Sequence, residues 1–197
     1  MLVDWEISHL LEIGAVCIEP LLDLREQLNP AGIDLRLDTQ LKEFKHMDRA
    51  AIDPHEQMSY DQELYEHKEI DVRSAQAHYV LQKGTFIIAQ SLERLALPST
   101  IAGALDGRSS LARIGVVVHV TAGSIDPGFK GHVTFELANL GTMPVLIRPF
   151  DRVARLILHR TNRVKKPYAG KYQHQTGVMP SRIFLDQRQP AEKPSSA

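Results

Sequence analysis

The sequence predicts a mainly β protein, folded as a barrel or a jelly-roll-like sandwich. From residue 78 onward, short apolar or alternating runs follow one another: TFIIAQSL, TIAGAL, GVVVHVTA, GHVTFELA, PVLIRP and VARLILH. Turn segments rich in glycine, proline or aspartate separate these runs, among them GSIDPG and NLGTMP. Many short strands at such spacing are typical of closed or two-layered β folds. The strand–helix alternation of a doubly wound sheet is missing from the sequence, so that fold class is not expected.

The N-terminal segment predicts a short amphipathic helix over residues 4–13. Asp4 is placed to cap this helix, and Gly14 suits its C-terminal stop. Its apolar residues recur at helical spacing and form one stripe, which comprises Ile7, Leu10 and Leu11.

A strand is expected over residues 31–37, AGIDLRL, because apolar and polar residues alternate there. Ile33, Leu35 and Leu37 would share the buried face of a half-buried strand. Residues 46–70 are polar, rich in acids and histidines, and show no clear period. We expect a long excursion there and predict no structure for it.

The bulk properties fit a single domain, predicted over residues 1–185. The polar, proline-bearing end of the chain, residues 186–197, is expected to be a disordered tail. The formal net charge of -1 gives no reason to expect nucleic acid or an acidic membrane as partner. No apolar run approaches the ~20 residues that cross a bilayer, and the N-terminus lacks the pattern of a signal peptide. With Cys17 as the single cysteine, these features predict a cytoplasmic protein.

The octapeptide DGRSSLAR, residues 106–113, is a candidate polyphosphate site. Ser109 or Ser110 can act as the N-cap of a short helix that Gly115 would end. A helix N-terminus offers free N–H groups, and Arg108 and Arg113 would add permanent charge and several donors. A capped surface turn with two solvated arginines is the alternative reading of the same residues.

The strand that follows SIDPG carries one carboxylate in an apolar run. Val133, Phe135 and Leu137 would face one way, and His132, Thr134 and Glu136 the other. If both faces are covered, burial would raise the pKa of Glu136 toward that of a general base. The alternative is a solvated side chain on the outer face of an edge strand.

Several other motifs are incomplete. His67-Lys68-Glu69 fits half of a zinc deaminase signature, but the cysteines of its second half are missing. The nine histidines show no metal-ligand spacing, and GRSSL lacks the second glycine of a hydrolase nucleophile elbow. We therefore expect neither zinc chemistry nor a serine nucleophile.

Three linked motifs resemble the dCTP deaminases: GRSSLAR, then HVTAGSIDPGFKGHVTFEL, then KYQHQTG. The resemblance is clearest over residues 76–183. It implies the distorted jelly-roll or β-barrel fold of the dUTPase-like superfamily, with a short N-terminal helix and a short helix after GRSS. It also implies a homotrimer with active sites between subunits, and dCTP as substrate.

The resemblance implies how the phosphates and the reacting water are held. The triphosphate, arriving with Mg²⁺, would bind Arg108, Ser109 and Ser110, in a turn that Leu111 and Ala112 continue. Arg113 would approach the reacting base and its water.

The base and sugar would bind the second motif. The backbone at Thr121 and Ala122 would hold the water, and Asp126 would meet the deoxyribose. The stretch from Thr134 to Glu136 would border the base, with Phe135 between them. A C-terminal arm near residues 165–180 would close over the site through Tyr168, Lys171 and Gln175; the short spacing from Tyr168 to Lys171 departs from some members.

The predicted activity is hydrolytic deamination of dCTP to dUTP and ammonia, which supplies dUTP and dTTP precursors. Glu136 would act as the base, while Ser109 and Arg113 would orient the water and stabilise developing charge. A bifunctional enzyme that continues to dUMP and pyrophosphate is the main alternative. Gly123 after TA resembles the bifunctional members, whereas Arg155 stands where those members often carry glutamine.

Three further alternatives stay open. A dUTPase without deaminase activity would lack a need for Glu136 and would use a glycine-rich arm in place of KYQHQTG. A nucleotide-binding regulator would keep Arg108 and Ser110 without the base. A cupin-like metal protein is suggested by the fold class alone.

Overall fold

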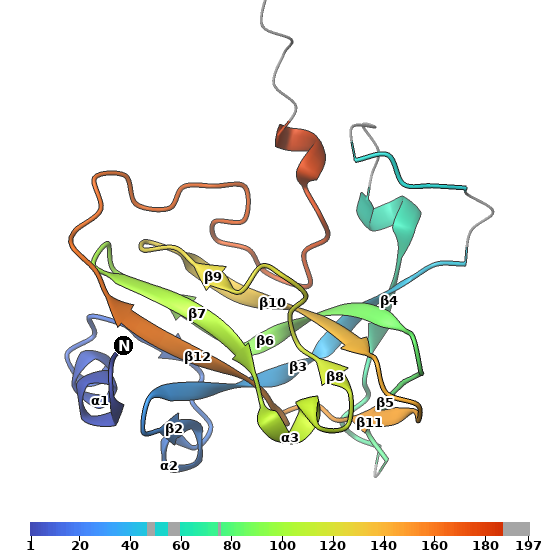
Figure 1. Cartoon of the computed structure of the whole chain (residues 1–197), viewed down its shortest axis with the longest axis horizontal. Coiled ribbons are helices and arrows are strands. Elements are labelled where there is room, and N and C mark those ends of the chain that lie inside the picture. The colour runs from blue at the N-terminus through green and yellow to red at the C-terminus, as the bar shows by residue number, and fades with distance from the viewer. Residues whose placement is uncertain (47–49, 55–59, 75, 187–197) are drawn as a thin grey trace, which may run out of the picture.

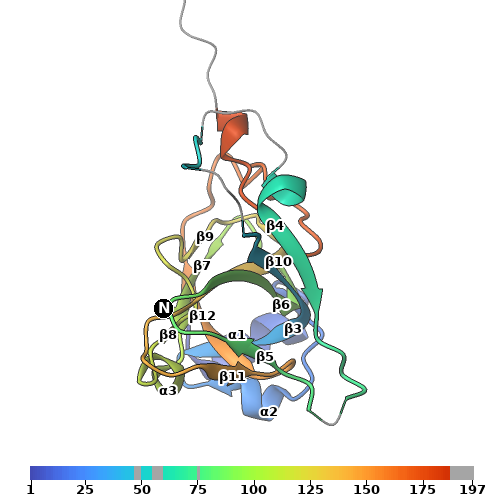
Figure 2. The same ribbon diagram turned by 90° about the vertical axis from the view of Figure 1, so that its right-hand side faces the viewer.

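The computed structural model describes residues 1–46, 50–54, 60–74 and 76–186 and has a mostly β fold, as predicted (Figure 1). A ten-stranded sheet curls around the hydrophobic core (Figure 2). Its main path runs β8-β10-β6-β3-β12-β7-β9, with β1 paired to β6 and with β2 and β4 paired to β3. Strands β5 and β11 form a separate antiparallel pair. This arrangement confirms the predicted class of a distorted β-barrel with few short helices.

The element bounds are as follows. The strands are β1 (Cys17–Glu19), β2 (Leu28–Asn29), β3 (Gly32–Phe44), β4 (Tyr65–Glu69), β5 (Tyr79–Leu81), β6 (Phe86–Ala96), β7 (Ile101–Gly107), β8 (Val116–Val117), β9 (Ser124–Ile125), β10 (Lys130–Asn139), β11 (Val145–Ile147) and β12 (Arg152–Arg160). The helices are α1 (Asp4–Glu12), α2 (Leu24–Gln27) and α3 (Ser109–Ala112), with a π-helical turn η1 (Tyr60–Leu64) and a 3₁₀ turn η2 (Ile183–Asp186). In the described part of the chain, no helix is long and apolar enough to cross a membrane.

Strand β10 confirms the predicted alternation. Val133, Phe135 and Leu137 are buried in the core, and Phe135 is fully buried. Thr134 and Glu136 lie on the opposite face and are half-buried. The pairing with β6 has an irregularity between His132 and Thr134, after which the register runs unbroken through Glu136. Because side chains alternate along a strand, this register sets which face each residue takes.

The N-terminal helix confirms the prediction in extent but not in its cap. Val3 is the N-cap, and its N–H donates to Glu6 Oε2 at 3.2 Å. Asp4 is the first helical residue, and its carboxylate accepts from the Trp5 N–H, so the expected Asp4 cap was wrong. Gly14 has a φ of 68°, a backbone conformation that suits glycine at a helix end.

Two strands differ in length from their predictions. Strand β3 extends to Phe44, and Asp34 is as fully buried as its neighbours Ile33 and Leu35. The start of β3 is therefore covered on both faces, where a half-buried strand was expected. The run GVVVHVTA forms only the two-residue strand β8 before it continues as a loop.

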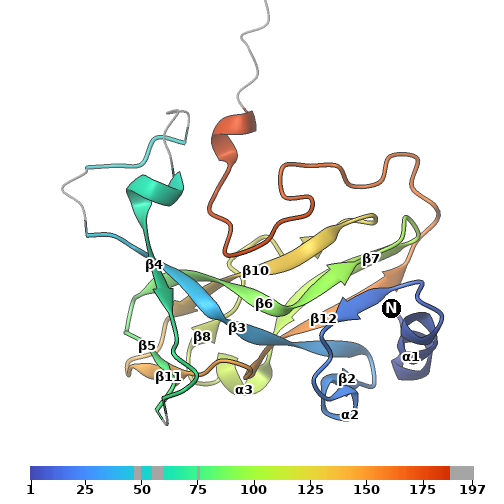
Figure 3. The ribbon, with the colours of Figure 1, turned by 180° about the vertical axis from the view of Figure 1, so that it is seen from behind.

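The 46–70 segment contributes structure that the sequence did not predict. Strand β4 pairs antiparallel with the second half of β3, which Figure 3 shows from behind. Turn η1 precedes it, and Lys42, only 3% exposed, makes an ion pair with Asp61 of that turn. Although burial acts to raise the pKa of Asp61, its bond to Lys42 outweighs this effect and lowers the pKa. Residues 47–49 and 55–59 of this segment lie outside the described residues, as does most of the predicted tail, residues 187–197.

Candidate active site

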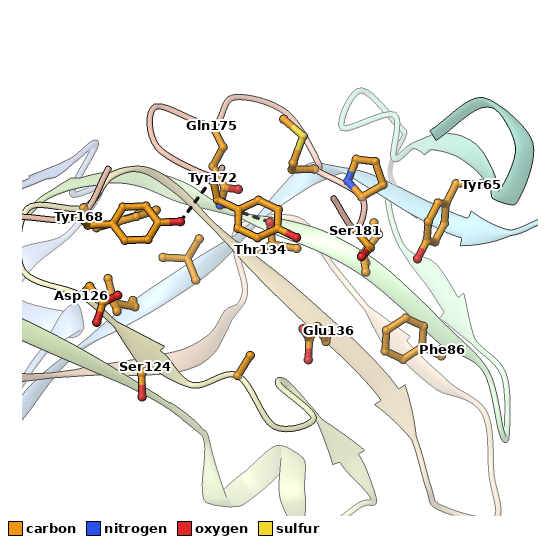
Figure 4. A pocket seen from close by; sticks show the side chains of 17 residues that line it. Tyr65, Phe86, Ser124, Asp126, Thr134, Glu136, Tyr168, Tyr172, Gln175 and Ser181 are labelled. Carbon is orange, nitrogen blue, oxygen red and sulfur yellow. Dashed lines mark hydrogen bonds between the residues drawn. The ribbon is translucent and has the colours of Figure 1, made fainter. Parts of the chain in front are cut away.

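Two pockets contain nine of the fifteen predicted site residues. The first, called here the Glu136 pocket, has a volume of about 410 Å³ and is lined by β6, β10, the loop from Ala122 to Phe129, the arm and Tyr65 (Figure 4). The second, the Arg108 pocket, has a volume of about 280 Å³ and is lined mainly by residues 106–110 and Arg155. Their linings have no described residue in common.

Glu136 occupies the middle of the first pocket. Strand β10 lies between β8 and β6, so Glu136 is not on an edge strand as the alternative reading supposed. Ile88 of β6 is its cross-strand partner, and the two side chains share the pocket face. The Val120 N–H donates to Glu136 Oε2 at 2.9 Å. This bond fixes one carboxylate oxygen and leaves the other available to a ligand.

One end of the Glu136 pocket is built by the SIDPG turn. Asp126 and Ser124 line this end, together with Tyr168 from the arm (Figure 4). Gly128 has a φ of 93°, and a Cβ there would lie 2.7 Å from Pro167 Cβ. Glycine is therefore required twice over, by its backbone conformation and by the close approach of the arm. Ala122 also lines the pocket, whereas Thr121 is exposed and outside its lining.

The arm, residues 165–180, is docked on the start of β10. The His174 N–H donates to the Lys130 carbonyl at 2.7 Å, and the Gln175 carbonyl accepts from the His132 N–H at 3.2 Å. The buried Gln175 amide donates to the His132 carbonyl and lies 3.4 Å from Thr134 Oγ1. These bonds hold the arm to the sheet beside this pocket, within one chain.

The structure does not bring every predicted arm residue into the pocket. Tyr168 and Gln175 line it, but Lys171 makes an ion pair with Asp186 and lies outside the lining. Tyr172 lines the pocket next to them, and its hydroxyl accepts from the Arg182 N–H at 3.1 Å. Phe135 points into the core, so only its backbone can border a ligand.

The arginine–serine turn, residues 108–113, forms one short helical turn, α3. Arg108 is its N-cap, and no side-chain hydrogen bond caps the helix, so the expected serine cap was wrong. Ser109 and Ser110 are exposed and line the Arg108 pocket. Arg113 is the exposed C-cap and lies outside both pocket linings, as do Leu111 and Ala112, which continue the turn.

A buried carboxylate holds the arginines of the second pocket. Asp34 is fully buried, and three guanidinium groups surround it. Arg155 Nε donates to its Oδ1 at 3.2 Å, and Arg108 Nε lies 3.3 Å from its Oδ2. Arg152 Nη1 lies 3.7 Å from the same oxygen. Asp106 adds a second carboxylate to the pocket lining, so three guanidinium groups face two carboxylates, and one excess positive charge beside the exposed serines suits an anion.

In the described residues, no group of three or more His, Cys, Asp and Glu side chains is placed to hold a metal ion. The Arg108 pocket is instead rich in guanidinium donors. Its chemistry fits a metal ion only as a companion of a bound polyphosphate, whose own oxygens would supply most of the ligands.

Several lining residues of the Glu136 pocket were missed by sequence reasoning. Phe86, Ile88 and Tyr65 reach it only through the pairing of β6 with β10 and of β4 with β3. That register is not visible in a single sequence. Tyr172 could have been found, because it lies inside KYQHQTG between two predicted residues.

Comparisons with known proteins agree with this geometry. The family model described as dCTP deaminase-like matches residues 1–161. A protein named dCTP deaminase from Haloarcula marismortui is 37% identical over 191 residues, covering 94% of this chain and 96% of the relative. Proteins named dCTP deaminase, dUMP-forming, from Dictyoglomus thermophilum and Halobacterium salinarum are 36% and 38% identical, each over the same shares of the two chains.

A solved structure supports the fold. The crystal structure of 2'-deoxycytidine 5'-triphosphate deaminase from Agrobacterium tumefaciens superposes with a TM-score of 0.62 at 23% identity, covering 81% of this chain and 48% of that longer chain. The matched family model and the curated relatives show that the present chain belongs to the dCTP deaminase-like family.

Proposed function

We propose that the protein hydrolyses the amino group of dCTP to give dUTP and ammonia. The observation that carries the proposal is the half-buried Glu136 carboxylate, held by the Val120 N–H inside a pocket that the arm covers. The names of the curated relatives support dCTP as the substrate.

The reaction follows from the position of Glu136. Its free carboxylate oxygen removes a proton from water as the water oxygen bonds to C4 of cytosine, and N3 takes up a proton. Glu136 passes this first proton to N3, then takes the proton of the new C4 hydroxyl and gives it to the amino group, so that ammonia leaves and C4 becomes a carbonyl. The C4–O bond forms, the C4–N bond breaks and no oxidant is needed. Ser109 and Arg113 would orient the water and stabilise the charge that develops.

Each proposed active site combines the Glu136 pocket of one subunit with the arginine–serine turn of another, in a homotrimer. The separation of the two pockets within one chain supports this arrangement, as does the exposure of Ser109, Ser110 and Arg113. Thr121, exposed beside the pocket, would contribute its backbone to the water site.

A mixing experiment tests the shared site. Glu136→Gln and Arg108→Ala trimers should each be inactive, but mixed trimers reassembled from both should recover roughly a quarter of the wild-type activity, because some sites receive both intact halves. No recovery after verified subunit exchange would contradict a site shared between subunits.

The triphosphate is proposed to bind the Arg108 pocket. Arg108 and Arg155, held by Asp34, would meet the phosphate oxygens, and Ser109 and Ser110 would add hydroxyl donors. Mg²⁺ bound to the triphosphate would neutralise part of its charge. Lys171 would join the phosphates by exchanging its bond to Asp186 for one to the nucleotide.

Deamination followed by release of dUMP and pyrophosphate is the second candidate. Two of the curated relatives described above carry a dUMP-forming name, and Gly123 lies against the His119 ring, where a Cβ would meet its Cε1 at 3.1 Å. Arg155 favours simple deamination, because it is held by Asp34 and by Asn29 Oδ1 at 2.9 Å and is not free to position a water.

A product assay on dCTP, CTP and dUTP with Mg²⁺ tests the proposal. We expect ammonia and dUTP from dCTP, little reaction with CTP and no pyrophosphate from dUTP. Pyrophosphate with dUMP would identify the bifunctional enzyme, and pyrophosphate from dUTP without ammonia from dCTP would identify a dUTPase. Binding without turnover would indicate a regulator, and activity that depends on a tightly bound transition metal would indicate a cupin-like protein. The proposed location is the cytoplasm, in keeping with the single Cys17.

A further inference from the structure

The 46–70 segment brings an aromatic side chain into the Glu136 pocket. Tyr65, the first residue of β4, lines this pocket and is only 7% exposed. Figure 4 shows Tyr65 and Phe86 on one side of Glu136, with Asp126 and Tyr168 on the other. The pocket thus has two chemically different ends.

The sheet register explains how Tyr65 reaches this pocket. Ile88 is paired with Glu136 on one side and with Lys42 on the other, and Lys42 is paired with His67. Tyr65 lies two residues before His67, so it shares the sheet face of Glu136. Four adjacent strands, β4, β3, β6 and β10, therefore place one face toward the pocket.

Tyr65 is held rigidly in this position. Its ring lies 4.5 Å from the Phe44 ring, centroid to centroid, and Phe44 is its cross-strand partner. A satellite hydrophobic cluster surrounds it, in which Leu64, Ile88 and Val178 are buried. Val178 belongs to the arm, so the arm contributes to the same cluster as β4. Because Tyr65 packs against Phe44 and within this cluster, its ring has little space to move away from a bulky ligand.

The end of the pocket formed by Tyr65 is largely apolar. Phe86 and Ile88, which share the hydrophobic cluster of Tyr65, line it with Ser181 nearby, whereas Asp126 and Ser124 line the other end (Figure 4). Burial, followed by the charges of Glu136 and Tyr172, raises the pKa of Tyr65 to about 12, so its phenol stays neutral. The ring of Tyr65 and the side chains of Phe86 and Ile88 suit a C–H edge of a base, while the neutral Tyr65 hydroxyl remains a hydrogen-bond donor.

We propose that Tyr65 is a substrate-contacting residue that closes the pocket against the C5–H edge of the pyrimidine and so sets an upper limit on 5-substituents. This inference rests on the proposed function. With the deoxyribose at Asp126 and C4 at Glu136, the base has two edges flanking C4. N3 needs a polar partner, so the apolar end formed by Tyr65, Phe86 and Ile88 fits the C5–H edge.

Substrates of graded size test this wall. The wild type is assayed with dCTP, 5-methyl-dCTP and 5-propynyl-dCTP, and the matching 5-substituted dUTP compounds serve as binding competitors. We expect kcat/KM to fall steeply with the size of the substituent, by about 10-fold or more for the propynyl group. The inhibition constants of the competitors should rise in the same order.

Variants assign this size limit to Tyr65. Tyr65→Ala should lower kcat/KM for dCTP, but the ratio of kcat/KM for dCTP to that for 5-propynyl-dCTP should decrease at least several-fold. Tyr65→Phe should keep the wild-type ratio. Tyr65→Leu retains apolar packing against Phe44 and serves if the alanine variant does not fold. Tyr168→Ala, at the opposite end of the pocket, is the matched control and should leave the limit unchanged.

The outcomes separate the two proposals. If the wild type neither binds nor deaminates dCTP, the proposed function fails. If it deaminates dCTP and accepts 5-propynyl-dCTP equally well, or if Tyr65→Ala and Tyr65→Leu keep the wild-type size limit, the role of Tyr65 is overturned while the function stands.

Discussion

The Glu136 pocket and the Arg108 pocket are built in opposite ways. Residues of the Glu136 pocket come from β4, β6, β10 and the arm, and backbone hydrogen bonds close it within one chain. Most of the Arg108 pocket comes from one contiguous turn, and the serines that face it are exposed. The half that would bind the base is thus preorganised by long-range pairing, whereas the half that would bind phosphate lies open for a partner surface.

The two regions also differ in how they carry charge. Glu136 is a single half-buried carboxylate held by one backbone N–H. The arginines of the other region are anchored through their shared contact with the fully buried Asp34. Substitution of Glu136 should therefore lower turnover, whereas substitution of Asp34, which anchors the arginines, should lower affinity.

The largest effect is expected for Glu136→Gln. The amide keeps the shape but cannot accept a proton, so kcat should fall by about 10²–10⁴-fold while dCTP still binds. Steady-state kinetics and calorimetric titration with dCTP measure the two quantities separately. Glu66→Gln, at an exposed position on β4, is the control. Near-normal turnover by Glu136→Gln would exclude it as the base.

Asp34→Asn should have the next largest effect. Loss of the carboxylate leaves Arg108 and Arg155 without their anchor, so Kd for dCTP should rise by about 10-fold or more. Binding of deoxycytidine, which has no phosphate, should barely change. We also expect a loss of about 1–3 kcal/mol in the free energy of unfolding, moderated because the arginines can reach water. Equal weakening of both ligands would indicate a general structural defect in place of a positioning role.

Gln175→Ala tests whether this side chain holds the arm on β10 and so preorganises the Glu136 pocket. Removing an amide that bonds to the His132 carbonyl should loosen the arm and raise KM by about 3- to 10-fold. Tryptic cleavage after Lys171 should accelerate in the variant and slow again when dCTP is added. Thr176→Ala, at the neighbouring exposed position, should change neither measurement. An unchanged cleavage rate in Gln175→Ala would show that this side chain does not hold the arm.

Glu93 tests a buried carboxylate outside both pocket linings and should affect activity least. Burial raises its pKa to about 7, against the opposing bonds from the Arg36 N–H and Gln27. The unfolded chain loses this proton at a lower pH than the folded one, so the stability contributed by Glu93 falls as pH rises from about 4.5 to 7. Glu93→Gln removes this dependence and should gain about 1–3 kcal/mol relative to the wild type between pH 5 and pH 8. Urea unfolding at both pH values measures the gain, and a constant difference would contradict the raised pKa.

Local patterns predicted the fold class and the faces of β10, because alternation is a property of adjacent residues. Asp34 shows where such reasoning stops. Its place in AGIDLRL suggests an outer, solvated side chain, but Arg155 reaches it from 121 positions away. Tyr65 lies in a polar run without a period and is buried because β4 pairs with β3 and a cluster with Ile88 and Val178 packs around it. Lys171 and Tyr172 are neighbours in one motif, yet a tertiary contact with Asp186 decides which of them lines the pocket.

In strand β10, one alternation of side chains supplies both the hydrophobic core and the pocket. Odd-numbered residues from Val133 to Leu137 fill the core, and Thr134 and Glu136 face the pocket. Inserting or deleting one residue between the irregularity at His132 and Glu136 would exchange the two sets, so that a carboxylate entered the core and a phenyl ring entered the pocket. A change of length by one residue in this short stretch would therefore reduce both the stability of the fold and the activity of the site.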